Sequence, residues 1–274
     1  MFNKLACFPA FLLIAAAALL ASGCGAAGQA PGTGTDTGAK GTITVSAAIS
    51  LKDVLAGLGK NFEKAHPGTS VKFNFGASGD LEEQIIAGAP VDVFASAGVK
   101  ETNDLSGKGK ILSGTLSEPA ENEVVLVIPA QGSSSGCGAS FASLAGPACG
   151  KIAIGSPETV PAGRYARDVL NYYGIWNKVK SRLVYAESVR QVLDYVARGE
   201  VDAGLVYTTD ALTSPGQVKV TQTAPEASHQ PVVYPVAVIA GSPREALARE
   251  FVSYLGSPQA AAIFKKYGFK IRGG

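Results

Sequence analysis

Two serines stand where a predicted β-strand gives way to a helix, and a serine at such a turn can play two roles. Ser50 follows the strand-like run 42–47, and Ser78 lies in the turn 76–80. Such a serine can cap its helix by accepting a hydrogen bond from a backbone N–H, which contributes about 1 kcal/mol. The turn also presents free N–H groups and the positive end of the helix dipole, so a donating hydroxyl makes it an anion site. For an isolated serine the cap is the commoner role.

A serine nucleophile is the other chemistry that these residues could support, which would make the chain a secreted hydrolase. Neither serine lies in a Gly-x-Ser-x-Gly elbow, and neither of the two histidines, His66 and His229, has a recognisable acidic orienter. The histidines also lack neighbouring ligands at a metal-site spacing. We therefore expect neither an enzyme nor a protein-built metal site. We expect His66 to end a helix at the surface and His229 to lie in a polar loop.

The composition describes a globular protein without a strongly charged partner. Of the 274 residues, 46% are hydrophobic and 17% are charged, which allows a sizeable core in one or two domains. Lys and Arg number 24 against 22 Asp and Glu, so the net charge is only +2. Because no basic run could neutralise many phosphates, we expect no nucleic-acid partner.

From residue 41 onward, strand-like and helix-like runs alternate. The strand-like runs cover 42–47, 70–75, 91–95, 123–128, 151–154, 182–185, 203–207 and 232–239. The helix-like runs cover 51–64, 81–87, 163–173, 189–198, 244–255 and 259–267. This order predicts an α/β fold of two lobes, each a mainly parallel sheet flanked by helices, with the last run returning to the first lobe. The turns before 163–173 and 189–198 offer free N–H groups, although alone each is an ordinary helix start.

The first forty residues predict export and anchoring. Residues 5–21 are apolar, uncharged and slightly too short to span a membrane, and small residues follow them, which is typical of a signal peptide over residues 1–23. The segment 20–24 (LASGC) resembles a bacterial lipobox, in which Cys24 would become the lipidated first residue; simple cleavage with a free terminus is the alternative. Residues 24–40 would then form a lipid anchor and a flexible tether. We expect the protein in the periplasm or on the cell surface, held at the membrane by lipid.

The other cysteines are Cys7, inside the signal peptide, and Cys137 and Cys149, in the Gly/Ser/Ala-rich loop 131–150. In an oxidising exterior the latter two are candidates for a disulfide that closes a surface loop, worth up to about 3 kcal/mol in the chain-entropy model. Neither has a charged or histidine neighbour that would make it a reactive thiolate.

Several strings, in order along residues 41–271, carry a family resemblance. They are 41–51 (GTITVSAAISL), 88–94 (GAPVDVF), 160–166 (VPAGRYA), 234–238 (YPVAV) and 259–269 (QAAAIFKKYGF). Together they closely resemble the periplasmic molybdate-binding proteins of bacterial molybdate ABC transporters. The resemblance implies a type II periplasmic-binding-protein fold in which two lobes, 41–121 plus 235–274 and 122–234, are joined by two crossing segments near Glu121 and Tyr234.

The resemblance also implies a set of ligand contacts. Carried over position by position, hydroxyl donors fall on Ser50, Ser78 and Tyr207, and backbone N–H donors fall on Ala162 and Val189. The implied ligand is molybdate or tungstate, held through its oxygens, so we expect no direct protein–metal bond and no cofactor. The family often has more serines around Ser78 and a run of alanines before Ser50. These departures leave the pocket shape and the choice between molybdate and tungstate open.

Such a site donates hydrogen bonds and carries no full charge. Molybdate at neutral pH is a fully deprotonated dianion that only accepts, whereas phosphate keeps a proton that a pocket carboxylate could accept. Sulfate has no proton either, so donor spacing must separate it from molybdate. Sulfate, another oxyanion or a small organic acid therefore stays an alternative ligand. Likewise, Tyr207 could be an ordinary strand-end tyrosine with its hydroxyl in water.

Charged residues beside the implied donors have other expected roles. Arg164 and Arg190 are expected to be solvated or to close the lobes. The nearby carboxylates are expected to cap helices or support loops: Asp53, Glu158, Glu187 and Asp210. The implied mechanism is closure of the lobes by hinge motion, which traps the anion for an ABC permease. The transporter ATPase must be a separate chain, because this one has no Walker motif, and we expect the binding protein to be a monomer.

Overall fold

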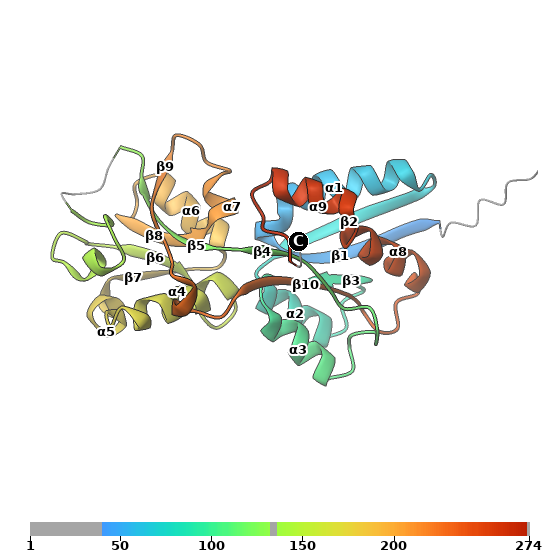
Figure 1. The fold of residues 1–274 in the computed structure, drawn as a ribbon. Helices are drawn as coiled ribbons and strands as arrows, with labels where there is room; N and C mark the ends of the chain where they lie inside the picture. The colour runs from blue at the N-terminus through green and yellow to red at the C-terminus, as the bar shows by residue number, and fades with distance from the viewer. Residues whose placement is uncertain (1–39, 132–135, 273–274) are drawn as a thin grey trace, which may run out of the picture. The chain divides into compact units, whose positions relative to one another are not determined.

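The computed structural model describes residues 40–131 and 136–272. The predicted signal peptide over residues 1–23, the lipidation candidate Cys24 and residues 25–39 of the predicted tether lie outside the described residues. The described chain forms two five-stranded sheets with helices packed on them (Figure 1). Within these residues no helix is long and apolar enough to cross a membrane.

The first lobe is built on a sheet in the order β2-β1-β3-β10-β4. Its strands are β1 (Gly41–Ala48), β2 (Thr69–Gly76), β3 (Val93–Ala95), β4 (Ser117–Asn122) and β10 (Val232–Val238). Its helices are α1 (Lys52–Ala65), α2 (Ser78–Ile86), α3 (Val99–Gly107), α8 (Glu245–Leu255) and α9 (Pro258–Lys266). Figure 1 shows α1, α8 and α9 on one face and α2 and α3 on the other. The C-terminal helix α9 packs on α1, α8 and β4 of the first lobe.

The second lobe repeats this plan with the order β7-β6-β8-β5-β9. Its strands are β5 (Val124–Pro129), β6 (Ile152–Gly155), β7 (Leu183–Ala186), β8 (Ala203–Tyr207) and β9 (Val218–Thr223). Its helices are α4 (Pro161–Tyr172), α5 (Trp176–Val179), α6 (Val189–Ala197) and α7 (Thr208–Ala211). Short 3₁₀ turns complete the described chain: η1 (Ile49–Leu51), η2 (Ala142–Ala145), η3 (Lys180–Arg182) and η4 (Glu226–Ser228).

Each sheet is mixed, because one strand runs against the other four. In the first sheet that strand is β10, and in the second it is β5; each pairs antiparallel with both of its neighbours. These are also strands on which the chain passes from one lobe to the other, since β5 follows β4 after one residue and β10 follows the second-lobe strand β9. The expected mainly parallel arrangement is confirmed for the remaining strands, and the crossings explain the exceptions.

Five helices and strands of the described chain were absent from the sequence prediction, namely α3, α5, α7, β4 and β9. Strand β4 has the sequence SEPAEN, which combines charged residues with a proline and has little apolar alternation. It lies at the edge of the first sheet, where proline is tolerated because one side of the strand needs no ladder bonds. Strand β9 is likewise an edge strand, and none of its residues is fully buried. Edge strands have the weakest hydrophobic alternation, so the sequence pattern did not predict β4 and β9.

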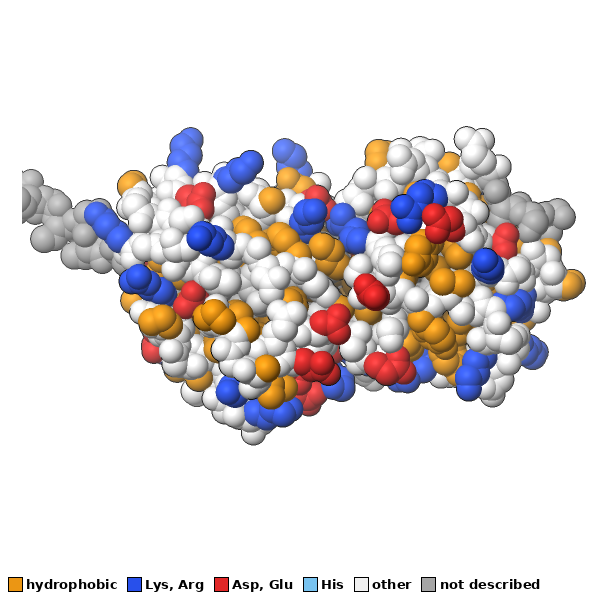
Figure 2. All heavy atoms as spheres, turned by 180° about the vertical axis from the view of Figure 1, so that it is seen from behind, with side chains coloured by type: hydrophobic (Ala, Val, Ile, Leu, Met, Phe, Trp, Pro, Cys, Tyr) orange, Lys and Arg blue, Asp and Glu red, His pale blue; other side chains and the backbone are white. Residues whose placement is uncertain are grey.

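The cysteine loop is tied down by covalent and polar contacts. Cys137 and Cys149 form a disulfide with Cα atoms 4.8 Å apart, and both cysteines are buried. The guanidinium of Arg182 donates to the carbonyls of Gly146 at 2.9 Å and Leu144 at 3.0 Å and also to that of Cys149. On the face shown in Figure 2, basic and acidic side chains are interspersed over both lobes.

Candidate functional site

A small cavity of about 10 Å³ lies where the two lobes meet, and all five predicted site residues line it. Its first-lobe wall comes from the ends of β1 and β2, the start of α2 and the residue Ala97 after β3. Its second-lobe wall comes from the starts of α4 and α6 and the end of β8. The lining residues are Ala48, Ile49, Ser50, Gly76, Ala77, Ser78, Ala97, Val160, Pro161, Ala162, Val189 and Tyr207. Among these described residues there is no charged side chain.

Ser50 and Ser78 are both buried, and neither caps its helix. The N-cap positions of η1, α1 and α2 are Ala48, Leu51 and Ala77, and none of these helix starts has a side-chain cap. Instead the Ser50 hydroxyl oxygen accepts from the hydroxyl of Tyr234 at 3.2 Å, and the Ser78 oxygen accepts from the Ala97 backbone N–H at 3.1 Å. The capping role is therefore wrong for both serines. Because each oxygen already accepts a bond, each hydroxyl retains its hydrogen for a ligand in the cavity.

The second lobe presents backbone amides at two helix starts. Ala162 is the second residue of α4 and Val189 is the first residue of α6, so neither N–H has a partner within its own helix. Pro161 fits the first position of α4 because it has no N–H to lose. Helix α4 lies directly on the end of β6: a Cβ on Gly163 would come within 2.1 Å of the Gly155 carbonyl oxygen. The glycine thus allows the approach that brings the start of α4 to the cavity.

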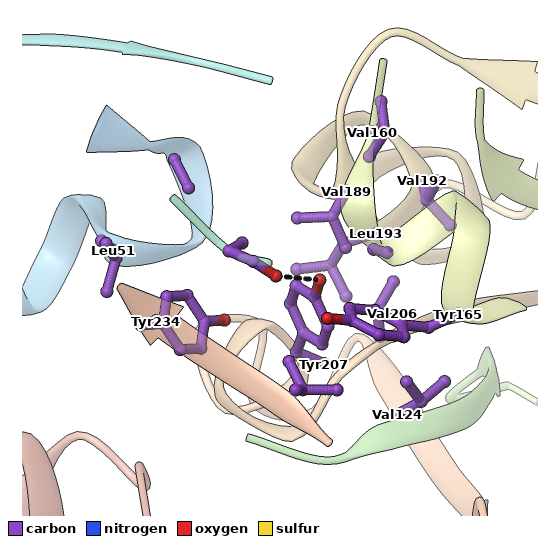
Figure 3. Packing of buried hydrophobic residues seen from close by; sticks show 14 of the residues in the cluster. Leu51, Val124, Val160, Tyr165, Val189, Val192, Leu193, Val206, Tyr207 and Tyr234 are labelled. Carbon is purple, nitrogen blue, oxygen red and sulfur yellow. Dashed lines mark hydrogen bonds between the residues drawn. The ribbon is translucent and has the colours of Figure 1, made fainter. Parts of the chain in front are cut away.

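Tyr207 contributes the hydroxyl of the second-lobe wall. Its hydrogen is bonded to a first-lobe carbonyl in this structure, so it has to turn away from that carbonyl to reach a ligand. Tyr207 is the last residue of β8 and is 1% exposed, and its hydroxyl donates to the Ala97 carbonyl of the first lobe at 3.3 Å (Figure 3). Burial raises the pKa of Tyr207 well above its ordinary value, so the hydroxyl keeps its proton. The alternative of a strand-end tyrosine with its hydroxyl in water is wrong. Figure 3 shows Tyr207 beside Tyr165 and Tyr234, which pack edge-on to it.

Ion pairs join the lobes on either side of the cavity. Arg164 of α4 pairs with Glu101 of α3, and Arg190 of α6 pairs with Asp53 of α1 at 2.6 Å and with Asp210 of α7 at 2.5 Å. Both arginines are mostly buried, so their expected lobe-closing role holds and the solvated alternative does not. Burial raises the pKa of the Asp210 carboxyl, and the Arg190 charge opposes that rise.

The four carboxylates expected to cap helices or support loops behave differently from one another. Asp53 and Asp210 pair with Arg190, which corrects their expected roles, because each lies within reach of a guanidinium. Glu158 accepts from the Ser156 hydroxyl at 2.6 Å, which supports the loop before α4. Glu187 is exposed, and its backbone N–H donates to the Gln191 side chain at 2.7 Å. The residue that does cap α6 is Ser188, whose oxygen accepts from the Gln191 N–H.

The backbones of the two lobes also touch. The Gly79 N–H donates to the Thr159 carbonyl at 2.9 Å, and a Cβ on Gly79 would lie 2.7 Å from that residue's Cα and carbonyl oxygen. A side chain at position 79 would hold the lobes apart. Sequence reasoning did not single out this contact, nor the roles of Ala97, Glu101 and Asn122. No local motif marks them, because their partners lie far away along the chain.

The histidines lie away from the cavity. His66 follows α1, is half-buried and stacks on Phe62 at a centroid distance of 4.0 Å, while His229 contacts the Gln230 carbonyl and the Tyr165 ring. Neither is among the residues that line the cavity with the serines, so the structure supports no serine–histidine pair in the described chain. Within the same residues no group of three or more His, Cys, Asp or Glu is arranged to hold a metal ion.

Comparison with known proteins agrees with this geometry. A family model described as bacterial extracellular solute-binding protein matches residues 43–270. The chain belongs to this family. It is 40% identical to the molybdate-binding protein ModA of Escherichia coli, over 85% of this chain and 90% of that protein. It is 42% identical to YvgL of Bacillus subtilis, over 98% and 99% of the two chains; YvgL carries the provisional name of an ABC transporter substrate-binding lipoprotein.

Solved structures show the same fold. The periplasmic molybdate-binding protein of Azotobacter vinelandii matches with a TM-score of 0.73 and 29% identity, over 83% of this chain and 98% of that chain. The sulfate-binding protein SubI of Mycobacterium tuberculosis matches with a TM-score of 0.73 at 19% identity, which shows the fold alone. The two-lobed periplasmic-binding fold and the resemblance to molybdate-binding proteins are thus confirmed. The chain is an ABC transporter substrate-binding protein, a class that binds solutes and does not catalyse reactions.

Proposed function

We propose that this chain captures molybdate, and also tungstate, between its lobes and delivers it to an ABC permease. The observation that carries the proposal is the cavity itself, where hydroxyls of the first lobe face amides and a hydroxyl of the second lobe and no charged side chain of the described chain intrudes. A ligand for such a wall must accept every bond. A proton-free tetrahedral oxyanion meets that requirement.

The size of the cavity favours an inorganic ion over an organic one. Its volume of about 10 Å³, roughly the space of one water molecule, is far smaller than the roughly 300 to 1,000 Å³ of pockets that hold organic ligands. Five charge-assisted hydrogen bonds of about 1.5 to 3 kcal/mol each would supply about 8 to 15 kcal/mol. Desolvation and lobe closure subtract from this sum, yet enough remains for tight binding without an arginine in the wall.

The absence of a carboxylate from the described cavity wall supports exclusion of phosphate. At neutral pH phosphate carries a proton, and a wall made only of donors offers that proton no acceptor. Sulfate has no such proton, so its exclusion would rest on the spacing of the donors. A fixed spacing matches either the shorter sulfur–oxygen bonds or the longer metal–oxygen bonds, not both.

Calorimetric titration of the mature protein, stripped of ligand, tests the proposal. We expect molybdate and tungstate to bind with dissociation constants of about 1 μM or below, sulfate more weakly, and phosphate not measurably. Tighter binding of sulfate, phosphate or an organic acid would refute it. Binding should also raise the melting temperature, since a ligand that binds only the folded state stabilises it by mass action.

We also propose that Cys24 carries the lipid anchor and that residues 25–40 tether the two lobes to the outer face of the cytoplasmic membrane. The lipobox-like sequence and the YvgL name support this step. Expression of the full chain and of Cys24→Ser, followed by membrane fractionation and palmitate labelling, tests it. We expect label and membrane association only with Cys24. A wild-type protein that is exported, unlabelled and free of the membrane would show simple cleavage instead.

A further inference from the structure

A chain of hydrogen bonds leads from the two crossing strands to the cavity. Asn122 ends β4, Tyr234 lies in the middle of β10, and Ser50 lies in the turn after β1. The Asn122 amide nitrogen donates to the Tyr234 hydroxyl at 3.0 Å, and this hydroxyl donates to the Ser50 oxygen at 3.2 Å. All three side chains are buried, with exposures of 7%, 0% and 3%. The chain thus ends on a cavity-lining serine.

The direction of the hydrogen bonds in this chain can be followed from Asn122, its first residue. The Asn122 side-chain oxygen accepts from the Glu123 backbone N–H at 2.9 Å, so the nitrogen is the end that faces Tyr234 and also Thr209, at 2.8 Å. An amide nitrogen only donates, so the Tyr234 oxygen accepts from it. The Tyr234 hydrogen stays available and is donated to Ser50. The Ser50 oxygen accepts in turn, which leaves its own hydrogen for the cavity. Burial raises the pKa of Tyr234, so its hydroxyl stays protonated.

We propose that Asn122 and Tyr234 are positioning residues that make Ser50 a dedicated donor, and that they thereby select for anions without a proton. The proposal rests on the oxyanion function proposed above. A serine hydroxyl is by nature both donor and acceptor, and a free one could turn to accept the hydrogen of a protonated anion such as hydrogen phosphate or hydrogen arsenate. With its oxygen engaged from behind, Ser50 presents its hydrogen to the ligand.

The second serine of the same wall provides the contrast. Ser78 accepts from a backbone N–H, that of Ala97, which no side-chain substitution removes. The orientation of Ser50 depends on side chains and can therefore be tested by mutation. Tyr234→Phe deletes the hydroxyl and keeps the ring, which packs edge-on against Phe269 at 5.3 Å and Tyr207 at 6.1 Å. Asn122 keeps Thr209 as a partner for its nitrogen.

Titration of Tyr234→Phe with molybdate, and displacement of molybdate by excess hydrogen arsenate, test the proposal. We expect molybdate affinity to fall about tenfold, the net effect of one hydrogen bond, and the preference for molybdate over arsenate to narrow. In a Ser50→Ala background the same substitution should have no further effect. Tyr173→Phe, which removes a hydroxyl in the second lobe that accepts from Gln222 at 3.3 Å, is the matched control and should change neither quantity.

The outcomes separate this proposal from the one on which it rests. If wild-type protein binds no molybdate, the proposed function fails. If wild-type protein binds molybdate but Tyr234→Phe keeps wild-type affinity and selectivity, or loses affinity equally with and without Ser50, the positioning role is wrong. Should Tyr234→Phe fail to fold, Asn122→Ala carries the test by the same two criteria, with a smaller loss of about threefold expected because Tyr234 remains.

Discussion

The two walls of the cavity offer the same chemistry by different means. The first lobe presents serine hydroxyls, which are held in orientation by bonds from Tyr234 and from the Ala97 backbone. The second lobe presents amides of Ala162 and Val189, which are oriented by the helices that they begin. A hydroxyl needs support to act only as a donor, whereas a backbone N–H can do nothing else. The first wall is therefore sensitive to side-chain substitutions behind it, and the second is sensitive to changes in backbone position.

The difference extends to charge. Each amide of the second wall stands near the positive end of a helix dipole, which favours an anion without placing a cation in the cavity. The nearby full charges, Arg164 and Arg190, are both paired with carboxylates. These pairs join the lobes instead of facing the cavity, so binding and closure are served by separate groups.

Removal of one amide from the second wall should have the largest effect. Val189→Pro deletes the N–H and places a ring carbon where its hydrogen stood. The helix should tolerate it, because proline suits the first helical position and Ser188 already has the extended φ of −156° and ψ of 161° that proline requires before it. We expect molybdate affinity to fall at least about a hundredfold, from one lost charge-assisted bond plus the steric conflict.

Val189→Ala is the control for that experiment, because it trims the buried side chain and keeps the amide. It should lower the stability and leave affinity within a few-fold of wild type. Equal losses of affinity in both variants, measured by calorimetry, would mean that the side chain and not the N–H matters. Circular dichroism would show whether α6 is retained in each.

Removal of a hydroxyl from the first wall should have the next largest effect. Ser78→Ala deletes a donor and leaves the buried Ala97 N–H without its acceptor. We expect a tenfold to hundredfold loss of molybdate affinity, at about 1.5 to 3 kcal/mol for a bond to a charged ligand. Ser257→Ala is the matched control, since Ser257 caps α9 by accepting from the Ala260 N–H. It should cost about 1 kcal/mol of stability and no affinity. An unchanged affinity in Ser78→Ala would refute the donor role.

These serines show what sequence reasoning can and cannot reach. The alternation of strand and helix runs predicted the fold well, and it placed Ser50 and Ser78 at strand-to-helix turns because parallel strands end at the same sheet edge. Local pattern could not separate a capping serine from a ligand serine. Both occur at the same position in the chain, and the difference lies in Tyr234 and Ala97, whose contacts with them are set by tertiary structure.

The second wall shows the opposite case. An amide at a helix start has no side-chain signature, so Ala162 and Val189 became candidates only through the family resemblance. The edge strand β4 was missed because SEPAEN has no apolar alternation, and with it the role of Asn122 was missed. The sequence predicted that Arg164 and Arg190 are either solvated or close the lobes. It could not predict their partners, because Arg190 and Asp53 are 137 residues apart and no local pattern links them.

The ion pairs that close the lobes should matter less than the walls, and unequally. Glu101 is 1% exposed and Asp53 is 42% exposed, so the first pair is shielded from water and the second is not. Glu101→Gln leaves Arg164 uncompensated in the closed state, and we expect about a tenfold loss of molybdate affinity with faster dissociation. Asp53→Asn leaves Arg190 its bond to Asp210, and we expect at most a two- to threefold loss that fades as salt rises. Stopped-flow measurement of the molybdate dissociation rate at two salt concentrations, together with the affinity, tests both variants. An affinity gain in Glu101→Gln would instead indicate that Arg164 attracts the anion directly.

The smallest effect on binding is expected from pH, because the titratable donor of the second wall is locked in one state. Burial raises the pKa of Tyr207 well above 10 and that of Tyr165 to about 12, so molybdate affinity should be flat between about pH 7 and 9.

The same raised pKa values make the stability depend on pH. A raised pKa in the folded protein means that a tyrosine loses its proton at lower pH in the unfolded chain than in the folded one. These tyrosines therefore cost no stability below about pH 10, and above it each lowers the unfolding free energy by up to about 1.4 kcal/mol per pH unit until its folded pKa is reached. Urea unfolding followed through tyrosinate absorbance should show this slope, and Tyr207→Phe should make it shallower. An equal slope in that variant would mean that Tyr207 titrates near its ordinary pKa in the folded protein, and its hydrogen would then not be a dependable donor.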